Sequence, residues 1–93
     1  MPKIKGWSKV DSIGVKETQV EWVNDNSRTA IKVADHNNNG GSTGWEIWKG
    51  KAKKGGGSRV YNRRLSFGGQ TIIPNKKKAM KYARTYMRRH PEG

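Results

Sequence analysis

The sequence predicts an α+β domain in which a curved, antiparallel sheet of four strands carries one C-terminal helix on one face, in the order β-β-β-β-α. The 93 residues are enough for one small domain. Four segments between residues 15 and 67 alternate apolar and polar residues and are separated by turn formers. Residues 76–90 instead repeat apolar residues at three- and four-residue steps, as an amphipathic helix does. A helix stripe and a sheet face that bury one another give a two-layer domain.

The first hairpin is predicted over residues 15–36, with its turn in the Asn-, Asp- and Ser-rich cluster at 24–27. Val20 and Trp22 fall on one side of its first strand, which we expect to be buried. Glu21 falls on the other side, which we expect to face solvent.

The second hairpin is predicted from strands at residues 45–52 and 59–67. Residues 49–58 are rich in lysine and glycine, and we interpret them as a basic, mobile hairpin tip. Neither flank is large enough to fold alone, which favours a tip over a linker between two domains. An engineered glycine-rich joint remains an alternative interpretation.

The helix is predicted at residues 76–90, with Asn75 as its N-cap and Pro91 at its end. Its apolar stripe comprises Ala79, Met80, Ala83, Tyr86 and Met87. A second, basic stripe comprises Lys77, Lys81, Arg84 and Arg88. The three lysines at 76–78 oppose the helix dipole, so we expect them to serve something other than helix stability.

The N-terminal residues 1–13 show little pattern, and we expect residues 1–6 to fray while Trp7 and Ile13 pack onto the domain. No apolar run approaches the ~18 residues of a membrane span. These features predict no membrane partner and a cytoplasmic, nucleoid-associated location, or one inside a virion.

The charge distribution is the most informative functional signal. The net charge is +13, and residues 1–46 are balanced, with six basic and six acidic groups. Residues 47–93 hold fourteen Lys and Arg against Glu92 alone, so the whole excess lies in the second half. Such a field attracts polyanions and favours a nucleic acid as the partner.

Nothing in the sequence predicts catalysis, a metal site or a cofactor. There is no cysteine, and the two histidines, His36 and His90, lie in no metal-ligand spacing. The seven acidic residues are scattered rather than clustered as a divalent-metal nuclease requires. We therefore expect a binding protein rather than an enzyme.

The candidate interface interleaves aromatic and basic residues along the second hairpin, with the basic helix stripe beside it. The expected phosphate contacts are Lys49, Lys51, Lys53, Lys54, Arg59, Arg63 and Arg64, with Lys77, Lys81, Arg84 and Arg88 on the helix. Trp48 and Tyr61 are the candidates for stacking on bases, whereas Trp22 and Trp45 are expected in the core. Single-strand binding requires exposed rings; duplex binding places the rings in the core and arginines in a groove.

These features predict a non-catalytic, largely sequence-nonspecific DNA-binding protein, suited to packaging or protecting a chromosomal or viral genome, as an archaeal chromatin protein does. The DNA is either double- or single-stranded. Two alternatives remain: an RNA-binding, ribosome-associated protein, and a small regulatory module that binds an acidic protein.

Residues 44–90 resemble small, uncharacterised prokaryotic and archaeal proteins in which a Gly-Trp pair opens a strand and a helix carries spaced Ala, Ala-Arg and His residues. Gly44-Trp45, Ala79, Ala83-Arg84 and His90 match that layout, while Lys78 stands where those proteins carry an acidic residue. The element order is also similar to half of a Whirly-type or transcriptional-coactivator-type fold that binds single-stranded DNA. In those folds two copies commonly pair, which implies either a monomer or a homodimer here.

Overall fold

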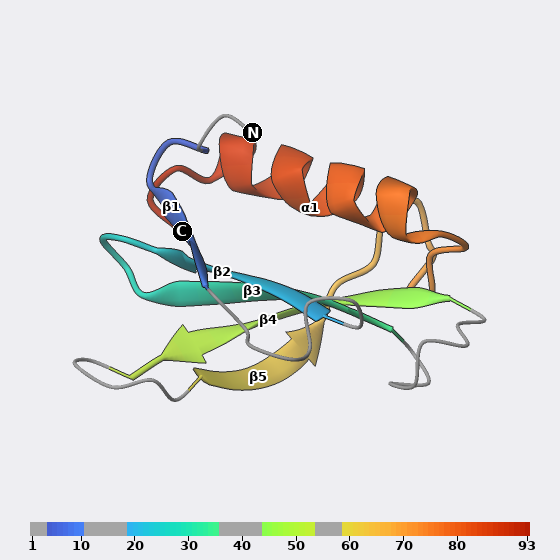
Figure 1. The fold of residues 1–93 in the computed structure, drawn as a ribbon, viewed down its shortest axis with the longest axis horizontal. Coiled ribbons are helices and arrows are strands. Elements are labelled where there is room, and N and C mark those ends of the chain that lie inside the picture. Colours follow the sequence, from blue (N-terminus) through green and yellow to red (C-terminus); the bar gives the residue numbers. More distant parts are fainter. Residues whose placement is uncertain (1–3, 11–18, 36–43, 54–58) are drawn as a thin grey trace.

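The computed structural model describes residues 4–10, 19–35, 44–53 and 59–93. A five-stranded antiparallel meander forms one layer and a single helix forms the other (Figure 1). The strands are β1 (Trp7–Val10), β2 (Gln19–Asn24), β3 (Thr29–Asp35), β4 (Trp45–Ala52) and β5 (Arg59–Arg64), and the helix is α1 (Lys76–Arg89). The α+β class, the antiparallel sheet and the C-terminal helix are confirmed.

The predicted count of four strands is wrong, because β1 adds a fifth strand at the edge beside β2. Four residues are too few to display a two-residue period, so β1 left no pattern to recognise. Trp7 of this strand is buried, and its Nε1 donates to the carbonyl oxygens of Met87 at 3.1 Å and His90 at 3.0 Å. β1 thereby ties the start of the chain to the end of α1. Of the N-terminal end expected to fray, residues 1–3 lie outside the described residues, and Ile4 packs against the core.

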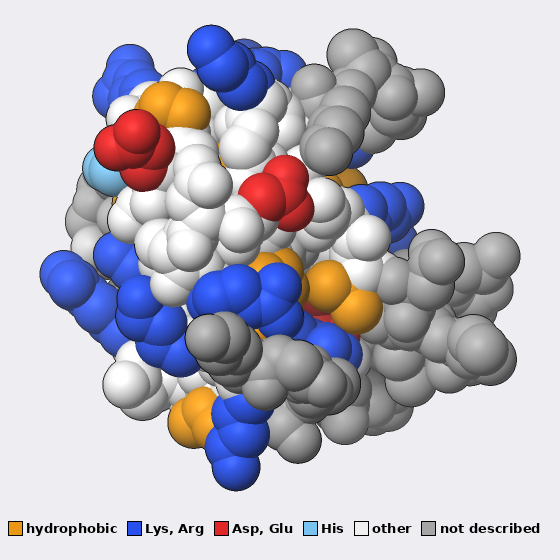
Figure 2. All heavy atoms as spheres, turned by 90° about the vertical axis from the view of Figure 1, so that its left-hand side faces the viewer, with side chains coloured by type: hydrophobic (Ala, Val, Ile, Leu, Met, Phe, Trp, Pro, Cys, Tyr) orange, Lys and Arg blue, Asp and Glu red, His pale blue; other side chains and the backbone are white. Residues whose placement is uncertain are grey.

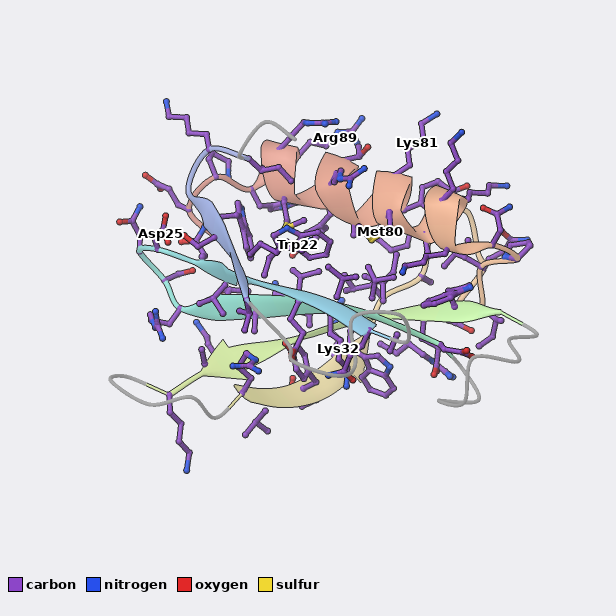
Figure 3. The ribbon with its side chains drawn as sticks, viewed as in Figure 1. Trp22, Asp25, Lys32, Met80, Lys81 and Arg89 are labelled. Atoms are coloured by element: carbon purple, nitrogen blue, oxygen red, sulfur yellow. The ribbon has the colours of Figure 1, made fainter. Side chains whose placement is uncertain are left out.

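The main core lies between α1 and the sheet face that carries Val20 and Trp22 (Figure 3). Trp45 and Ile47 of β4 lie on the same face and are buried, as expected. The helix presents Ala79, Ala83 and Met87 to this face, all fully buried, so small residues allow α1 to approach the strands closely.

The ends of α1 follow the predicted capping chemistry. The Asn75 side chain accepts a hydrogen bond from the Lys78 backbone nitrogen at 2.8 Å, which confirms the N-cap. No acidic residue lies in the first turn, so Lys76–Lys78 do oppose the helix dipole. Within the described part of the chain, no helix is long and apolar enough to cross a membrane.

The pairing of β5 with β4 contains a register shift at Lys49/Gly50. Lys49 pairs with Arg63, but Gly50 pairs with Tyr61, so Asn62 is the extra residue of a β-bulge. A Cβ on Gly50 would lie 1.8 Å from the Val60 carbonyl oxygen and 2.6 Å from the Tyr61 Cα. Glycine is therefore required for β5 to approach β4 at this point.

The strand expected over residues 59–67 ends at Arg64. Phe67 instead forms an isolated bridge with Gln70 across the turn at Gly68 and Gly69, which both have positive φ. Ile73 forms a second isolated bridge with Trp45, which closes the connection between β5 and α1.

Replacing Gly50 tests the close approach of β5. Gly50→Ala should lower the free energy of unfolding by about 1–3 kcal/mol, because backbone atoms of β5 must move to admit the methyl group. The measurement is chemical denaturation followed by far-UV circular dichroism.

Gly68→Ala is the comparison variant. Its Cβ would meet nothing within 4 Å, so any loss of stability would come only from placing an alanine at a positive φ. An equal or larger loss for Gly68→Ala than for Gly50→Ala would contradict the steric account.

Candidate nucleic-acid interface

The sheet face turned away from α1 carries a row of three charged side chains and one aromatic ring. Glu21, Lys32, Trp48 and Arg64 are successive register partners across β2, β3, β4 and β5. The strand alternation places this row opposite the buried Trp22 and Ile47 side. Trp48 therefore lies outside the core beneath α1, as the alternation predicted.

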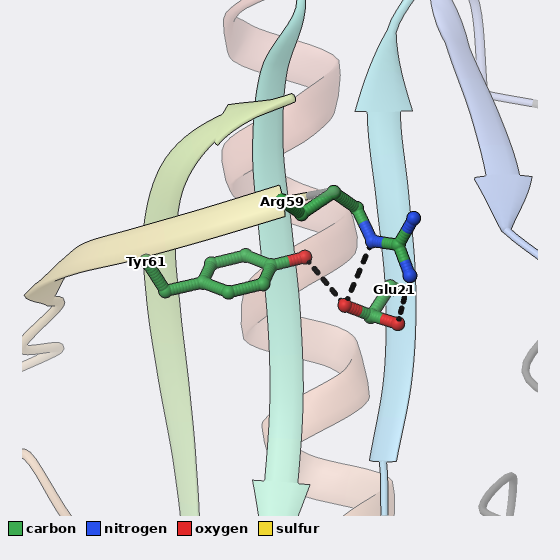
Figure 4. A network of polar contacts seen from close by, with 3 residues as sticks. All are labelled: Glu21, Arg59 and Tyr61. Atoms are coloured by element: carbon green, nitrogen blue, oxygen red, sulfur yellow. Dashed lines mark hydrogen bonds and ion pairs between the residues drawn. The ribbon is translucent and has the colours of Figure 1, made fainter. Parts of the chain in front are cut away.

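Beside this row, Tyr61 packs on a second, smaller apolar cluster formed by Val23, Ala30 and Ala52. In a flat sheet, β2 and β5 would lie three strand spacings apart, roughly 14 Å. Here Tyr61 and Arg59 of β5 both bond to Glu21 of β2, because β5 bends across the face of the intervening strands (Figure 4). The sheet is curved, and its concave side is partly filled by its own side chains.

The Glu21 carboxylate is the centre of this network. Arg59 binds it with two nearly parallel hydrogen bonds, Nε to Oε1 at 3.0 Å and Nη2 to Oε2 at 3.1 Å. The Tyr61 hydroxyl donates to Oε1 at 2.8 Å. Glu21 is only 3% exposed, so the expectation that this side of β2 faces solvent is wrong at Glu21. The bent β5 strand covers it, which a single-strand alternation pattern does not reveal.

Burial and the hydrogen bond to Glu21 raise the pKa of the Tyr61 phenol well above its ordinary value of about 10. The hydrogen bond with Glu21 also raises the pKa of the Arg59 guanidinium, although partial burial opposes this effect. Tyr61 therefore remains a protonated donor at neutral pH, and Arg59 stays charged. Both residues were predicted to contact the ligand, and in the structure both donate hydrogen bonds to Glu21.

A second ion pair lies further along the same face. Arg64 Nη1 donates to Glu46 Oε2 at 2.6 Å, and its guanidinium carbon lies 5.9 Å from the centre of the Trp48 ring. Glu46 is nearly buried, whereas the Arg64 side chain keeps 39% of its exposure and Trp48 is half-buried. Trp48 therefore offers part of one ring to solvent, beside a cation that is already paired.

The remaining candidates of the hairpin differ in availability. Lys49 is half-buried, with its Nζ 5.6 Å from the centre of the Tyr86 ring of α1. Lys51, Lys53 and Arg63 are exposed; the Lys51 Nζ donates to the Ser27 carbonyl oxygen at 3.2 Å. Lys54 and the rest of the expected tip, residues 54–58, lie outside the described residues, and Lys49–Ala52 belong to β4.

The predicted helix stripe is largely exposed. Lys77, Lys81 and Arg88 face solvent, and Arg84 is half-buried. Two further exposed cations, Lys78 and Arg89, were not among the predicted site residues. They stand next to stripe members in the KKK and RR runs, and counting every exposed helix position would have found them. We refer to Lys77, Lys78, Lys81, Arg88 and Arg89 together as the helix surface.

Acidic side chains are few on the surface of the described segments. Glu21, Asp35 and Glu46 are buried there, and Asp25 and Glu92 are exposed. Figure 2 shows Lys and Arg side chains over the helix at the top of the view and again over the strands below, with acidic side chains between them. Within the described segments, exposed cations therefore outnumber exposed acids.

No set of three or more His, Cys, Asp or Glu side chains that could hold a metal ion occurs in the described segments. Comparisons with protein-family models, with curated proteins and with solved structures found no match to this chain. The resemblances noted from the sequence, including the Whirly-type topology, therefore stay predictions.

Replacing Tyr61 tests the network through its pH dependence. A phenol with a raised pKa in the folded state contributes stability below its unfolded pKa of about 10 and loses it as pH rises further. Tyr61→Phe should lower the free energy of unfolding by about 1.5–3 kcal/mol at pH 7, because a hydrogen bond to a charged group is lost.

This difference between wild type and variant should shrink as the pH is raised above 10, where Tyr61 ionises on unfolding. Urea denaturation of both proteins between pH 7 and 11 measures it. A difference that stays constant over this range would contradict the assignment.

Proposed function

We propose that this protein binds duplex DNA through its phosphate backbone, without catalysis and largely without sequence preference. The proposal rests on how the charged side chains are distributed between the interior and the surface. Three acidic side chains of the described segments are buried, while exposed cations are abundant: Lys5, Lys9, Lys51, Lys53, Arg63, Lys77, Lys78, Lys81, Arg88 and Arg89, with Arg64 exposed but paired. A surface of this kind binds phosphates and releases their counterions.

The positions of the rings favour a duplex over a single strand. Trp7, Trp22 and Trp45 are buried, Trp48 is half-buried, and Tyr61 is engaged with Glu21. Within the described segments, Val60 is the one large apolar side chain that is well exposed, at 57%. Sequence-tolerant binding of single strands depends on rings that stack on successive bases. In the described strands the half-covered rings are Trp48 and Tyr61, and Tyr61 is held by Glu21.

The helix supplies a second argument. Lys76–Lys78 lie in its first turn, which contains no acidic residue, and each positive charge there disfavours the helix by a fraction of a kcal/mol. A role in solubility alone would be met equally well by lysines in the last turn. The Nζ atoms of Lys76 and Lys78 lie 5.5 Å and 5.9 Å from the ring centres of Trp45 and Tyr82, so the exposed Lys77 is the cation of this turn that a ligand with dense negative charge explains best.

The experiment is a titration with duplex DNA, single-stranded DNA and RNA of matched length, followed by anisotropy of a labelled ligand and by tryptophan fluorescence. We expect tightest binding to the duplex, little quenching, and a slope of log K against log salt between about −3 and −5, which corresponds to three to five neutralised phosphates. No binding to any of the three at about 0.1 M salt would overturn the proposal. Tighter binding to RNA would replace DNA with RNA as the ligand.

The Trp48→Ala variant separates backbone binding from stacking. Because Trp48 is half-buried and beside the paired Arg64, its removal should change duplex affinity by less than about threefold, whereas a stacked ring contributes ~1–3 kcal/mol per base. The same anisotropy titration measures it. A loss of tenfold or more, together with strong quenching in the wild type, would show that the ring binds bases.

A further inference from the structure

Helix α1 forms one layer of the molecule by itself, and its packing fixes which side faces outward. Ala79, Ala83 and Met87 point into the core and are fully buried, so the opposite side of the helix faces away from the sheet. Figure 1 shows no described helix or strand above α1, and Figure 3 shows Lys81 and Arg89 projecting outward from it. The outward side of α1 is therefore open to solvent.

The helical period locates the outward direction along the sequence. Successive residues of an α-helix are turned by about 100° about its axis. Ala83 is the middle one of the three buried residues, so its direction marks the side that faces the core. Lys81 and Thr85 each lie within about 20° of the direction opposite Ala83.

Two pairs of exposed cations flank this outward direction. Lys77 and Arg88 lie about 40–60° to one side of it, and we call them the first row. Lys78 and Arg89 lie about 40–60° to the other side, and we call them the second row. The two members of each row are separated by about three turns, or roughly 16 Å along the helix axis. The rows are therefore parallel, with the outward direction between them.

The helix pays for these rows in its own stability. Its sequence, KKKAMKYARTYMRR, contains no acidic residue, and like charges four residues apart, such as Lys77 and Lys81, destabilise a helix. The Lys78 Nζ lies 5.9 Å from the centre of the Tyr82 ring, which lies on the same side of α1 and holds this ammonium in its row.

The two rows match the shape of one groove of a DNA duplex. The major groove is about 12 Å wide and admits an α-helix, whereas the minor groove, about 6 Å wide, is narrower than a helix with its side chains, about 10–12 Å. A phosphate backbone that runs along the outside of a helix meets one row of cations. Both rows meet phosphates together where a backbone stands on each side of the helix, as it does in the major groove.

The residues between the rows suit a groove floor that is contacted with little base preference. The Thr85 Oγ1 donates to the Lys81 carbonyl oxygen at 2.9 Å, so its hydroxyl proton is already used within the helix. Lys81 carries one flexible ammonium, which makes single-point contacts rather than the bidentate contacts that specify a base.

Cations of the β4–β5 hairpin lie on the same side of the sheet as α1. Ile47 of β4 belongs to the core beneath the helix, and Lys49, on the same face, approaches the Tyr86 ring. The alternation of β4 places Lys51 on this face too, and Arg63 is the register partner of Lys49. Their positive charge therefore adds to the field on the α1 side of the molecule.

We propose that α1 lies in the major groove of duplex DNA, so that each of its two rows of cations contacts the backbone of one strand. This inference rests on the proposed function, because it names the element and the groove through which the phosphates are bound. The helix is about 21 Å long and spans roughly six base pairs.

The first test compares two duplexes of one sequence, one unmodified and one carrying glucosylated hydroxymethylcytosine. The added sugars occupy the major groove and leave the phosphates unchanged. Anisotropy of the labelled duplex at about 0.1 M salt should show binding to the glucosylated duplex weakened by about tenfold or more. Netropsin, a minor-groove ligand, should change the affinity for the unmodified duplex by less than about threefold.

The second test removes one row at a time. Lys77→Gln with Arg88→Gln removes the first row, and Lys78→Gln with Arg89→Gln removes the second. All four residues are exposed and the two variants have equal net charge, so they control for one another. Each variant should make the slope of log K against log salt less steep by about two, because each loses two phosphate contacts. Far-UV circular dichroism checks that both fold.

The other outcomes are distinct. Equal affinity for the two duplexes, or displacement by netropsin, overturns the major-groove inference and leaves the proposed function standing. A slope that changes in one row variant alone, or in neither, means that no backbone stands on each side of α1, which also overturns the inference. Binding to neither duplex overturns the proposed function, and the inference with it.

Discussion

The bend of β5 across the sheet, held by the Glu21 carboxylate, is the constraint on which the rest of the structure depends. Gly50 lets the strand approach because no side chain stands in its way, and the bulge at Asn62 turns the strand. Arg59 and Tyr61 then reach Glu21 across two intervening strands. A small domain with few apolar residues thereby gains a second apolar cluster, formed by Val23, Ala30 and Ala52 beneath Tyr61. An isolated buried carboxylate would be costly, but this one accepts hydrogen bonds from both Arg59 and Tyr61.

The same constraint decides which charges remain for a ligand. Glu21 and Glu46 each hold an arginine of β5, so these acids neutralise cations on the curved face of the sheet. The exposed cations of α1 and of the β4–β5 hairpin are left with few acidic neighbours among the described residues. The proposed phosphate binding would therefore use cations outside the concave face, which serves mainly to close the sheet. Three of the eight aromatic rings are buried, and four of the other five are partly buried against the two apolar clusters.

The helix and the core side of the strands could be predicted from the sequence. The fifth strand and the Glu21 network could not, because they depend on contacts between residues far apart along the chain. The helix, its Asn75 cap and its buried alanines follow from local spacing, as does the core side of β2, β3 and β4. β1 is too short to show a period, so the fifth strand was missed. Glu21 looked solvated because alternation describes one strand, and its burial comes from β5, some 40 residues later. For the same reason Arg59 and Tyr61 were predicted as ligand contacts: basic and aromatic residues in a hairpin look alike whether they meet phosphate or a buried carboxylate.

The most direct test of this account is a map of the residues that duplex DNA contacts. Backbone amide shifts of ¹⁵N-labelled protein, followed while a short duplex is added, would provide it. The account predicts shifts along the outer side of α1 and around Lys51, Lys53 and Arg63, with the amides of Glu21 and Tyr61 unchanged because their network stays closed. Shifts concentrated on Trp48, Tyr61 and Arg59, with the helix unaffected, would contradict it and make the concave face of the sheet the binding site.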